Sequence, residues 1–174
     1  MVDVQRTAVR MMRLSGFSRV TVEQIAEAAG VSPSTVYRYF GTKEALVLWG
    51  GNGGELVARF ADANVGKKRT VEQAFAETAI DMYGVDEKNL LAQLTLVFGN
   101  ADLAVAFEHG LMSQRHALAE VIATHRESKS GARVAALAAA MLGVLIAVLD
   151  RWQATGGEKS LTRQITKAYE QVFA

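Results

Sequence analysis

The segment from Ser32 to Lys43 combines small hydroxyl side chains, two tyrosines and two basic residues. Hydroxyl groups can donate hydrogen bonds to DNA phosphates, and an arginine can grip a guanine edge through two hydrogen bonds. Val36 and Phe40 are four residues apart, so a helix here turns both to one apolar face. We predict a helix for the major groove, with the exposed residues Ser34, Thr35, Tyr37, Arg38 and Tyr39. The alternative is a plain helical bundle, but two exposed tyrosines beside an arginine are unusual on a merely polar surface.

Signals for helix starts and stops surround this segment. Thr21 is an expected N-cap with Gln24 in the capping-box position. Ser32 caps the next helix, with Pro33 in its first turn. Helix ends are expected at Gly16, Gly30 and Gly41, and Thr42 is expected to cap the following helix. Together they predict a three-helix helix-turn-helix head in residues 1–46.

The remaining chain, residues 47–174, is predicted to form a larger helical core, so the protein is all-α with about nine helices. Beyond the head, the apolar periodicity predicts helices near residues 43–63, 70–83, 87–98, 101–127, 131–154 and 160–173. A glycine run over residues 50–54 interrupts the first of these, at a cost of roughly 1 kcal/mol for each glycine in a helix interior. The run predicts a bend or close packing contact, with a functional hinge as the alternative.

The charge of the chain is divided unevenly. Residues 1–43 hold six Lys or Arg against three Asp or Glu, whereas the rest holds thirteen against fifteen. The basic excess therefore accompanies the helix-turn-helix, as phosphate binding requires. The chain has no cysteine, which excludes disulfides and thiolate metal sites. We find no nucleophile–base pair, nucleotide-binding loop or paired-carboxylate motif, and therefore expect no enzyme activity and no cofactor.

One uncharged apolar stretch, residues 134–149, needs a separate interpretation. It is shorter than the roughly 20 residues that span a bilayer, and charged residues flank it closely. We expect a helix buried by its own core and by a second copy of the chain, with a buried monomeric helix as the alternative. The N-terminus carries no signal-peptide pattern, so we expect a cytoplasmic protein. The predicted homodimer residues are Leu142, Leu145, Ile146, Leu149, Trp152, Leu161, Ile165, Ala168 and Val172.

A small-molecule site is predicted only loosely. Apolar candidates between the head and the dimer helices are Trp49, Phe60, Phe75, Met82, Tyr83, Leu91, Phe98, Phe107 and Met112, although each is more often ordinary core. Polar candidates for a ligand head group are His109, Arg115 and His116. His109 and His116 share a helix face but are separated by about 10 Å along the axis, too far for one metal ion. His116 with Glu120 is more simply a solvated pair, so we expect no metal.

The head resembles the DNA-binding domain of TetR-type transcriptional regulators. The resemblance rests on a dense run: Gly16, Thr21, Ile25-Ala26, Ala29-Gly30-Val31-Ser32, Thr35, Tyr37, Tyr39-Phe40, Lys43 and Leu46. It implies phosphate contacts from Thr21, Thr35, Tyr37, Tyr39 and Lys43, and base contacts from Pro33, Ser34 and Arg38, beside the capping Ser32. It also implies that residues 47–174 bind a ligand and dimerise through the last two helices.

Two departures from that family pattern bear on DNA binding. Ser34 stands where many members carry glycine, which alters the approach of the backbone to DNA. The chain also begins almost at the first helix, so we expect no long basic arm. A short segment with Arg151-Trp152 and Gly156-Gly157 resembles a subgroup with acyl-CoA-like ligands.

The leading hypothesis is a DNA-binding transcriptional regulator: a homodimeric repressor released from a palindromic operator by an apolar or amphipathic effector, with an acyl-CoA-like molecule as one candidate. Double-stranded DNA, a second copy and the effector are its expected partners, and a membrane is not. The alternative is a helical protein-interaction module whose head no longer binds DNA. Loss of base preference on Arg38→Ala separates the two.

Overall fold

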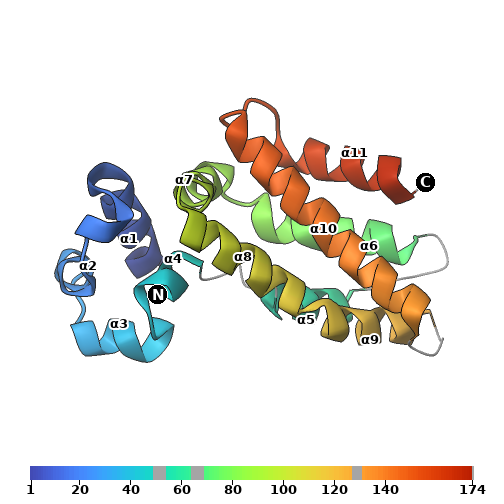
Figure 1. Cartoon of the computed structure of the whole chain (residues 1–174), viewed down its shortest axis with the longest axis horizontal. Helices are drawn as coiled ribbons and strands as arrows, with labels where there is room; N and C mark the ends of the chain where they lie inside the picture. Colours follow the sequence, from blue (N-terminus) through green and yellow to red (C-terminus); the bar gives the residue numbers. More distant parts are fainter. Residues whose placement is uncertain (49–53, 64–68, 127–130, 174) are drawn as a thin grey trace.

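The computed structural model describes residues 1–48, 54–63, 69–126 and 131–173, and every regular element in these ranges is helical (Figure 1). The all-α prediction is confirmed. The head contains α1 (Val2–Ser15), the short 3₁₀ helix η1 (Phe17–Arg19), α2 (Val22–Ala28) and α3 (Pro33–Phe40). The remaining helices are α4 (Lys43–Leu48), α5 (Gly54–Ala61), α6 (Val71–Tyr83), α7 (Glu87–Phe98), α8 (Ala101–Ser113), α9 (Arg115–His125), α10 (Ala132–Ala154) and α11 (Leu161–Phe173).

The caps of the head form as the sequence predicts. The Thr21 hydroxyl accepts from the Gln24 amide at 3.2 Å, and the Thr21 amide donates to Gln24 Oε1 at 2.9 Å. Ser32 accepts from the Thr35 amide at 3.2 Å, with Pro33 as the first helical residue. These bonds satisfy amide groups that the first turn of a helix leaves without partners. They fix where α2 and α3 begin, and therefore how α3 is oriented within the head.

Two of the long helices predicted from the sequence each correspond to two helices in the described residues. The predicted helix over residues 43–63 corresponds to α4 and α5, and residues 49–53, with Trp49 and most of the glycine run, lie outside the described residues. The predicted helix over residues 101–127 is interrupted at Gln114, which joins α8 to α9. The Ser113 hydroxyl donates to the Gly110 carbonyl there, a local bond that competes with the helical pattern.

The head and the larger part of the molecule are joined through α1 and α4. Helix α1 packs on α2, η1 and α4 within the head, and also on α7. Met12, Ile25 and Leu46 are fully buried and belong to the hydrophobic core of the head. On the other side, α6 packs on α11, and α10 packs on α7, α8, α9 and α11. Helix α4 likewise packs on α1 and α3 and also on α7 and α8, so α1 and α4 both belong to the two packing units.

Helix α10 is long and apolar enough to cross a membrane. Among the described residues it is the only unbroken helix that meets both criteria. In the fold it lies across the core, where Met141, Leu142, Leu145 and Leu149 are fully buried. Its opposite face exposes small residues four, three and four apart: Ala136, Ala140, Gly143 and Ala147. The helix thus has one buried apolar face and one exposed apolar face.

Candidate nucleic-acid interface and core cavity

Helix α3 divides into a buried and an exposed face. Val36 and Phe40 are 1% and 7% exposed, whereas Tyr37 and Tyr39 are 47% and 57% exposed. Ser34 and Arg38 are exposed as well. Figure 1 places α3 at the end of the molecule remote from α10 and α11, where no other described helix covers this face. The side chains that the sequence assigns to DNA are therefore available to a large partner.

Three hydroxyl groups meet where α3 begins. Ser32 Oγ lies 2.9 Å from both Ser34 Oγ and Thr35 Oγ1. Because Ser32 also accepts from the Thr35 amide, its position is fixed by the helix start. Ser34 is exposed and can rotate its hydroxyl outward. The cluster presents polar groups at the positive end of the helix dipole, which favours an anionic partner such as phosphate.

Tyr37 is oriented by an acidic residue of α2. Its hydroxyl donates to Glu23 Oε1 across a long contact of 3.4 Å. Partial desolvation, with the Glu23 carboxylate as the second cause, raises the pKa of Tyr37. The pKa of Glu23 is lowered, first by its own backbone amide and then by the Thr21 hydroxyl. Glu23 therefore stays ionised and Tyr37 stays protonated, so the phenol remains a donor near neutral pH.

Arg38 and Tyr39 form a contact of their own. The Arg38 guanidinium carbon lies 5.2 Å from the centre of the Tyr39 ring. A guanidinium over an aromatic face is held by cation–π attraction while its N–H groups remain free to bind elsewhere. The contact supports Arg38 in an outward position without using up its donors.

Lys43 lies in a more enclosed place than predicted. Its Nζ donates to the carbonyls of Phe17 at 3.0 Å and Val20 at 3.1 Å, and lies 4.4 Å from the centre of the Phe17 ring. These bonds tie η1 to the start of α4 and use two of the three donors of the ammonium group. Lys43 is thus first a brace of the head, and its predicted phosphate contact has one N–H left to use.

The predicted dimer residues require a correction. Six of them are buried within the protomer, with exposures of 0% to 3%: Leu142, Leu145, Leu149, Trp152, Leu161 and Ile165. Their side chains therefore have no free surface to offer a second chain. Trp152 also donates through Nε1 to the Lys159 carbonyl at 2.7 Å and so fixes the turn between α10 and α11. Ile146 and Ala168 are half-buried, and Val172 is 57% exposed.

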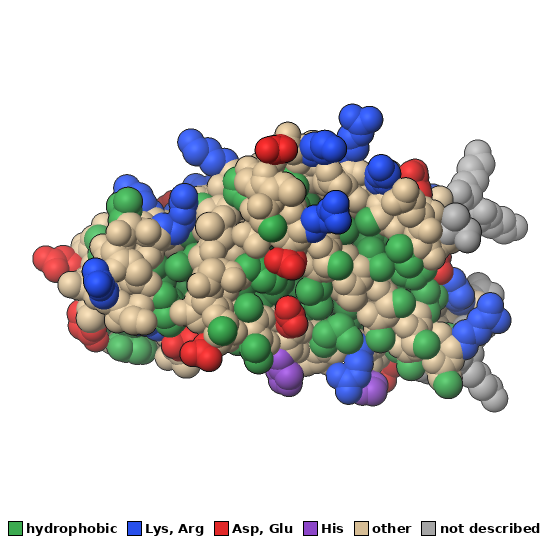
Figure 2. All heavy atoms as spheres, turned by 45° about the horizontal axis from the view of Figure 1, so that its top comes forward, with side chains coloured by type: hydrophobic (Ala, Val, Ile, Leu, Met, Phe, Trp, Pro, Cys, Tyr) green, Lys and Arg blue, Asp and Glu red, His purple; other side chains and the backbone are tan. Residues whose placement is uncertain are grey.

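The accessible part of α10 and α11 forms a shallow groove instead. Val144, Ala147 and Val148 of α10 line it on one side, and Ala168 and Val172 of α11 line it on the other. Figure 2 turns this side of the molecule forward and shows hydrophobic side chains gathered between lysines and arginines. An apolar surface with a charged rim is typical of protein contacts.

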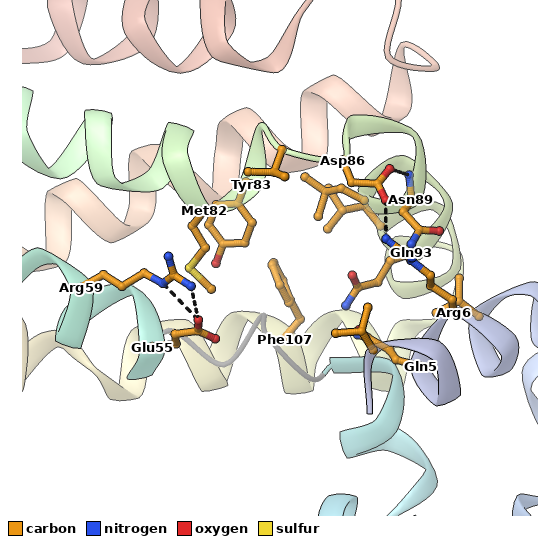
Figure 3. Close-up of a pocket in the computed structure, with 15 residues that line it drawn as sticks. Gln5, Arg6, Glu55, Arg59, Met82, Tyr83, Asp86, Asn89, Gln93 and Phe107 are labelled. Carbon is orange, nitrogen blue, oxygen red and sulfur yellow. Dashed lines mark hydrogen bonds and ion pairs between the residues drawn. The ribbon is translucent and has the colours of Figure 1, made fainter. Parts of the chain in front are cut away.

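A cavity of about 350 Å³ lies between α1 and the helices α5 to α8 (Figure 3). Three residues of the predicted ligand set line it, namely Met82, Tyr83 and Phe107. Helix α1 contributes Val2, Gln5, Arg6 and Val9. The cavity therefore lies at the junction of head and core. Sequence periodicity gave no signal for α1 as one of its walls.

Within the described residues, the other predicted ligand residues do not line this cavity. Phe60 and Phe75 are fully buried and meet edge to face, 5.4 Å between ring centres. Phe98 packs on Phe107 at 5.7 Å, and Met112 is half-buried against the core. His109 on α8, and Arg115 and His116 on α9, are exposed. Within the described ranges, no group of three potential metal-binding side chains comes together.

The Tyr83 hydroxyl is buried in the described structure without a hydrogen-bond partner. Figure 3 shows it directed between Met82, Glu55 and Phe107. Burial, with the Glu55 carboxylate as the second cause, raises the pKa of Tyr83 well above that of an ordinary tyrosine. The group therefore stays protonated, and it is a donor without an acceptor. Such groups cost free energy and are rare in folded proteins.

Two ion pairs and an amide border the cavity. Arg59 bonds to Glu55 Oε1 through Nε at 3.0 Å and Nη2 at 2.7 Å. Arg6 on α1 reaches Asp86 at 3.0 Å, and Gln93 Nε2 donates to the Val47 carbonyl at 2.6 Å. Of these contacts, only the Glu55–Arg59 pair could be predicted from the sequence, because residues four apart lie on the same face of a helix. The Arg6–Asp86 pair joins residues far apart in the chain, so only the fold brings it together.

Two family models match the chain. Residues 6–48 match one described as bacterial regulatory proteins, tetR family, and residues 68–174 match one described as the MftR C-terminal domain. No curated protein matches the chain.

Among solved structures, FadR from Bacillus halodurans has 21% identity and a TM-score of 0.66, over 97% of this chain and 95% of that one. Thermus thermophilus FadR in complex with lauroyl-CoA has 21% identity and a TM-score of 0.62, over 99% and 92%. FadR from Bacillus subtilis in complex with stearoyl-CoA has 19% identity and a TM-score of 0.64, over 97% and 95%. At these identities the likeness is one of fold.

Proposed function

The chain belongs to the tetR family of bacterial regulatory proteins, and on that premise we propose that it is a sequence-specific DNA-binding repressor. The observation that carries the proposal is the division of α3, with Val36 and Phe40 buried and the hydroxyl, tyrosine and arginine side chains exposed. A helix anchored on one face and polar on the other fits the major groove. The family model over residues 6–48 supports the same assignment.

The contacts proposed for DNA fall into two groups. Pro33, Ser34 and Arg38 lie at the start and on the exposed face of α3 and face the bases. Thr21, Ser32, Thr35 and Tyr39 bind phosphates through hydroxyl groups, and Lys43 adds its one remaining N–H. Tyr37 binds a phosphate by exchanging its long bond to Glu23 Oε1 for one to the DNA, because its hydroxyl has a single proton to donate. Phosphate contacts position a protein on DNA without reading sequence, whereas base contacts discriminate. Arg38 therefore carries most of the specificity of each head.

A homodimer is proposed because one head offers few base contacts. Two heads related by a two-fold axis read two half-sites of a palindromic operator. The contact is assigned to the exposed stripe of Ala136, Ala140, Gly143 and Ala147 together with the groove between α10 and α11. Small residues let two helices approach closely, and the exposed Val172 adds apolar area. Residues 1–46 are then the DNA-binding domain, and residues 47–174 the dimerisation and ligand-binding domain.

Release from the operator is assigned to a small effector in the helical core. Two structures of similar fold are of proteins bound to lauroyl-CoA and to stearoyl-CoA, which supports an amphipathic or acyl-CoA-like effector for this chain. An effector shifts the protein away from DNA only if it binds the two conformations with different affinity. We place the protein in the cytoplasm, where both DNA and such metabolites are present.

Selection of bound fragments from random double-stranded DNA tests the proposal. We expect a two-fold-symmetric consensus and an affinity that falls steeply as salt is raised, because phosphate binding releases counterions. Arg38→Ala serves as the matched variant and should lose preference at one position of each half-site. A protein without salt-dependent DNA binding would instead favour a helical interaction module. A consensus without two-fold symmetry would contradict the dimer.

A further inference from the structure

Glu23 on α2 contacts one of the side chains proposed to bind a phosphate. Helices α2 and α3 pack on each other at the end of the molecule remote from α10 and α11 (Figure 1). The Tyr37 hydroxyl of α3 donates to Glu23 Oε1 at 3.4 Å, although the two residues are 14 apart in the chain. The pKa of Glu23 is lowered first by its own backbone amide and then by the Thr21 hydroxyl, an effect of groups that donate hydrogen bonds to a carboxylate.

The donors that act on the Glu23 carboxylate are of the kind that proteins offer to a DNA phosphate. Hydroxyl groups of Ser, Thr and Tyr and backbone N–H groups supply many of the hydrogen bonds to phosphate oxygens. Here one amide and two hydroxyls act on an anion that belongs to the protein itself. In the free protein the carboxylate therefore has the place that a phosphate would take in a complex.

Other roles of Glu23 do not account for the contact with Tyr37. The capping box of α2 is formed by Thr21 and Gln24 and does not use the Glu23 side chain. Glu23 is exposed, and the ion pairs found among the described residues do not include it. Its charge suits the first turn of α2, but that effect needs no bond to another helix. Near DNA the same charge is unfavourable, because it repels phosphates.

The Tyr37 hydroxyl has one proton, so a bond to Glu23 excludes a bond to DNA. The phenol can donate either to the carboxylate or to a phosphate, but not to both at once. Because Glu23 stays ionised, it remains a strong acceptor near neutral pH. Docking of Tyr37 on a phosphate must therefore break an existing charge-assisted bond.

We propose that Glu23 is an internal competitor of the DNA phosphates: its carboxylate holds the Tyr37 hydroxyl in the free protein and so lowers the affinity of the head for every DNA sequence. The inference deepens the proposed function and rests on it. Phosphate contacts carry no sequence information, so the competitor weakens operator and non-operator DNA by the same factor. Discrimination between sequences stays with base contacts such as that of Arg38.

Glu23→Ala tests the competition, with Glu27→Ala as the matched control. Both residues are exposed on α2 and lie four apart on one face, so each variant removes one negative charge from the same surface. Fluorescence anisotropy measures the affinity of the full chain for a selected operator duplex and for a scrambled duplex.

Glu23→Ala should bind both duplexes about fivefold more tightly for each head engaged, the value of one weak hydrogen bond. The ratio of the two dissociation constants should stay that of the wild type. Glu27→Ala should bind both duplexes as the wild type does, because no phosphate-binding hydroxyl is released.

A double-mutant cycle with Tyr37→Phe separates competition from plain repulsion. If Glu23 acts by holding the hydroxyl proton, its removal brings little gain in a chain that lacks this hydroxyl. The gain from Glu23→Ala should therefore fall below about twofold in the Tyr37→Phe background. Repulsion between the carboxylate and a phosphate would leave the gain undiminished.

The contact itself can be measured without DNA. The pKa of Tyr37 is raised first by partial desolvation and then by the Glu23 carboxylate, so Glu23→Ala should lower it and Glu27→Ala should not. Phenolate absorbance during alkaline titration reports this group, once the spectrum of the matching Tyr37→Phe variant has been subtracted.

Wild-type DNA affinity of Glu23→Ala would overturn the proposal, as would an equal gain from Glu27→Ala, an undiminished gain in the Tyr37→Phe background, or an unchanged pKa of Tyr37. Where the wild type binds DNA with a steep salt dependence, each of these results rejects the competition and leaves the proposed function standing. A wild type without salt-dependent DNA binding would reject the proposed function, and the competition with it.

Discussion

Substitution of Ala147 by arginine tests the assignment of the dimer contact. Ala147 is exposed in the protomer, on the small-residue face of α10 and at the edge of the α10–α11 groove. An arginine there can extend into water in a monomer, so the protomer should keep its melting temperature. In an isologous dimer through this face each copy buries one new charge, because each presents the same surface to the other.

The magnitude follows from the cost of an uncompensated buried charge. Leaving one such charge without a partner costs about 3–5 kcal/mol. Even one charge at the lower bound raises the dimer dissociation constant more than 100-fold, since 1.4 kcal/mol is tenfold. Operator affinity should fall in parallel, because a monomer reads a single half-site.

Sedimentation velocity over a range of protein concentrations measures the dimer constant, and fluorescence anisotropy with a palindromic duplex measures DNA affinity. Ala117→Arg is the control, because Ala117 is an exposed alanine on α9, outside the α10–α11 groove. It should change neither quantity. A dimeric Ala147→Arg variant with wild-type operator affinity would refute the proposed contact.

Three further predictions concern the head and the buried Tyr83 phenol. Arg38→Ala should cost about 1–3 kcal/mol of operator binding and relax preference at one base pair, whereas Tyr37→Phe should weaken all sequences alike; parallel binding selections distinguish them. Lys43→Met should lower the free energy of unfolding, measured by urea titration, by about 1–3 kcal/mol, because the carbonyls of Phe17 and Val20 lose their donor. The control is Lys88→Met, which should leave the free energy of unfolding unchanged because Lys88 is exposed. Because burial raises the pKa of Tyr83 in the folded state, the unfolded chain loses this proton first, and stability should fall above about pH 10 by up to 1.4 kcal/mol per pH unit for this group; chemical denaturation at several alkaline pH values should show a smaller slope for Tyr83→Phe.

The head could be predicted from sequence because its signals are local. Thr21 with Gln24, and Ser32 with Pro33, fix helix starts through bonds that span three residues. The alternation of Val36 and Phe40 with exposed residues on α3 follows from helix geometry alone. Even so, Lys43 was assigned to DNA although the fold first uses it to hold η1, since its carbonyl partners lie more than 20 residues away.

The faces of α10 could not be predicted in the same way. The helix is apolar nearly all round, so periodicity does not tell which face meets the core of the protomer. Leu142, Leu145 and Leu149 were assigned to the partner because they lie in the apolar stretch of residues 134–149, but they are buried in the core of the protomer, and alanines and Gly143 are exposed instead. The cavity was out of reach for a related reason: Arg6 and Tyr83 belong to helices that only the fold brings together.

The double membership of α1 has a consequence for protein engineering. Exchange of DNA-binding heads between regulators assumes that specificity and sensing are separate modules, with a cut near residue 46. Here Val2, Gln5, Arg6 and Val9 would leave with the head, and one wall of the cavity would leave with them. A chimera that grafts a foreign head onto residues 47–174 would thus acquire a new operator and an altered ligand preference at once. A sensor that keeps its ligand needs the cavity-lining face of α1 transplanted back into the new head.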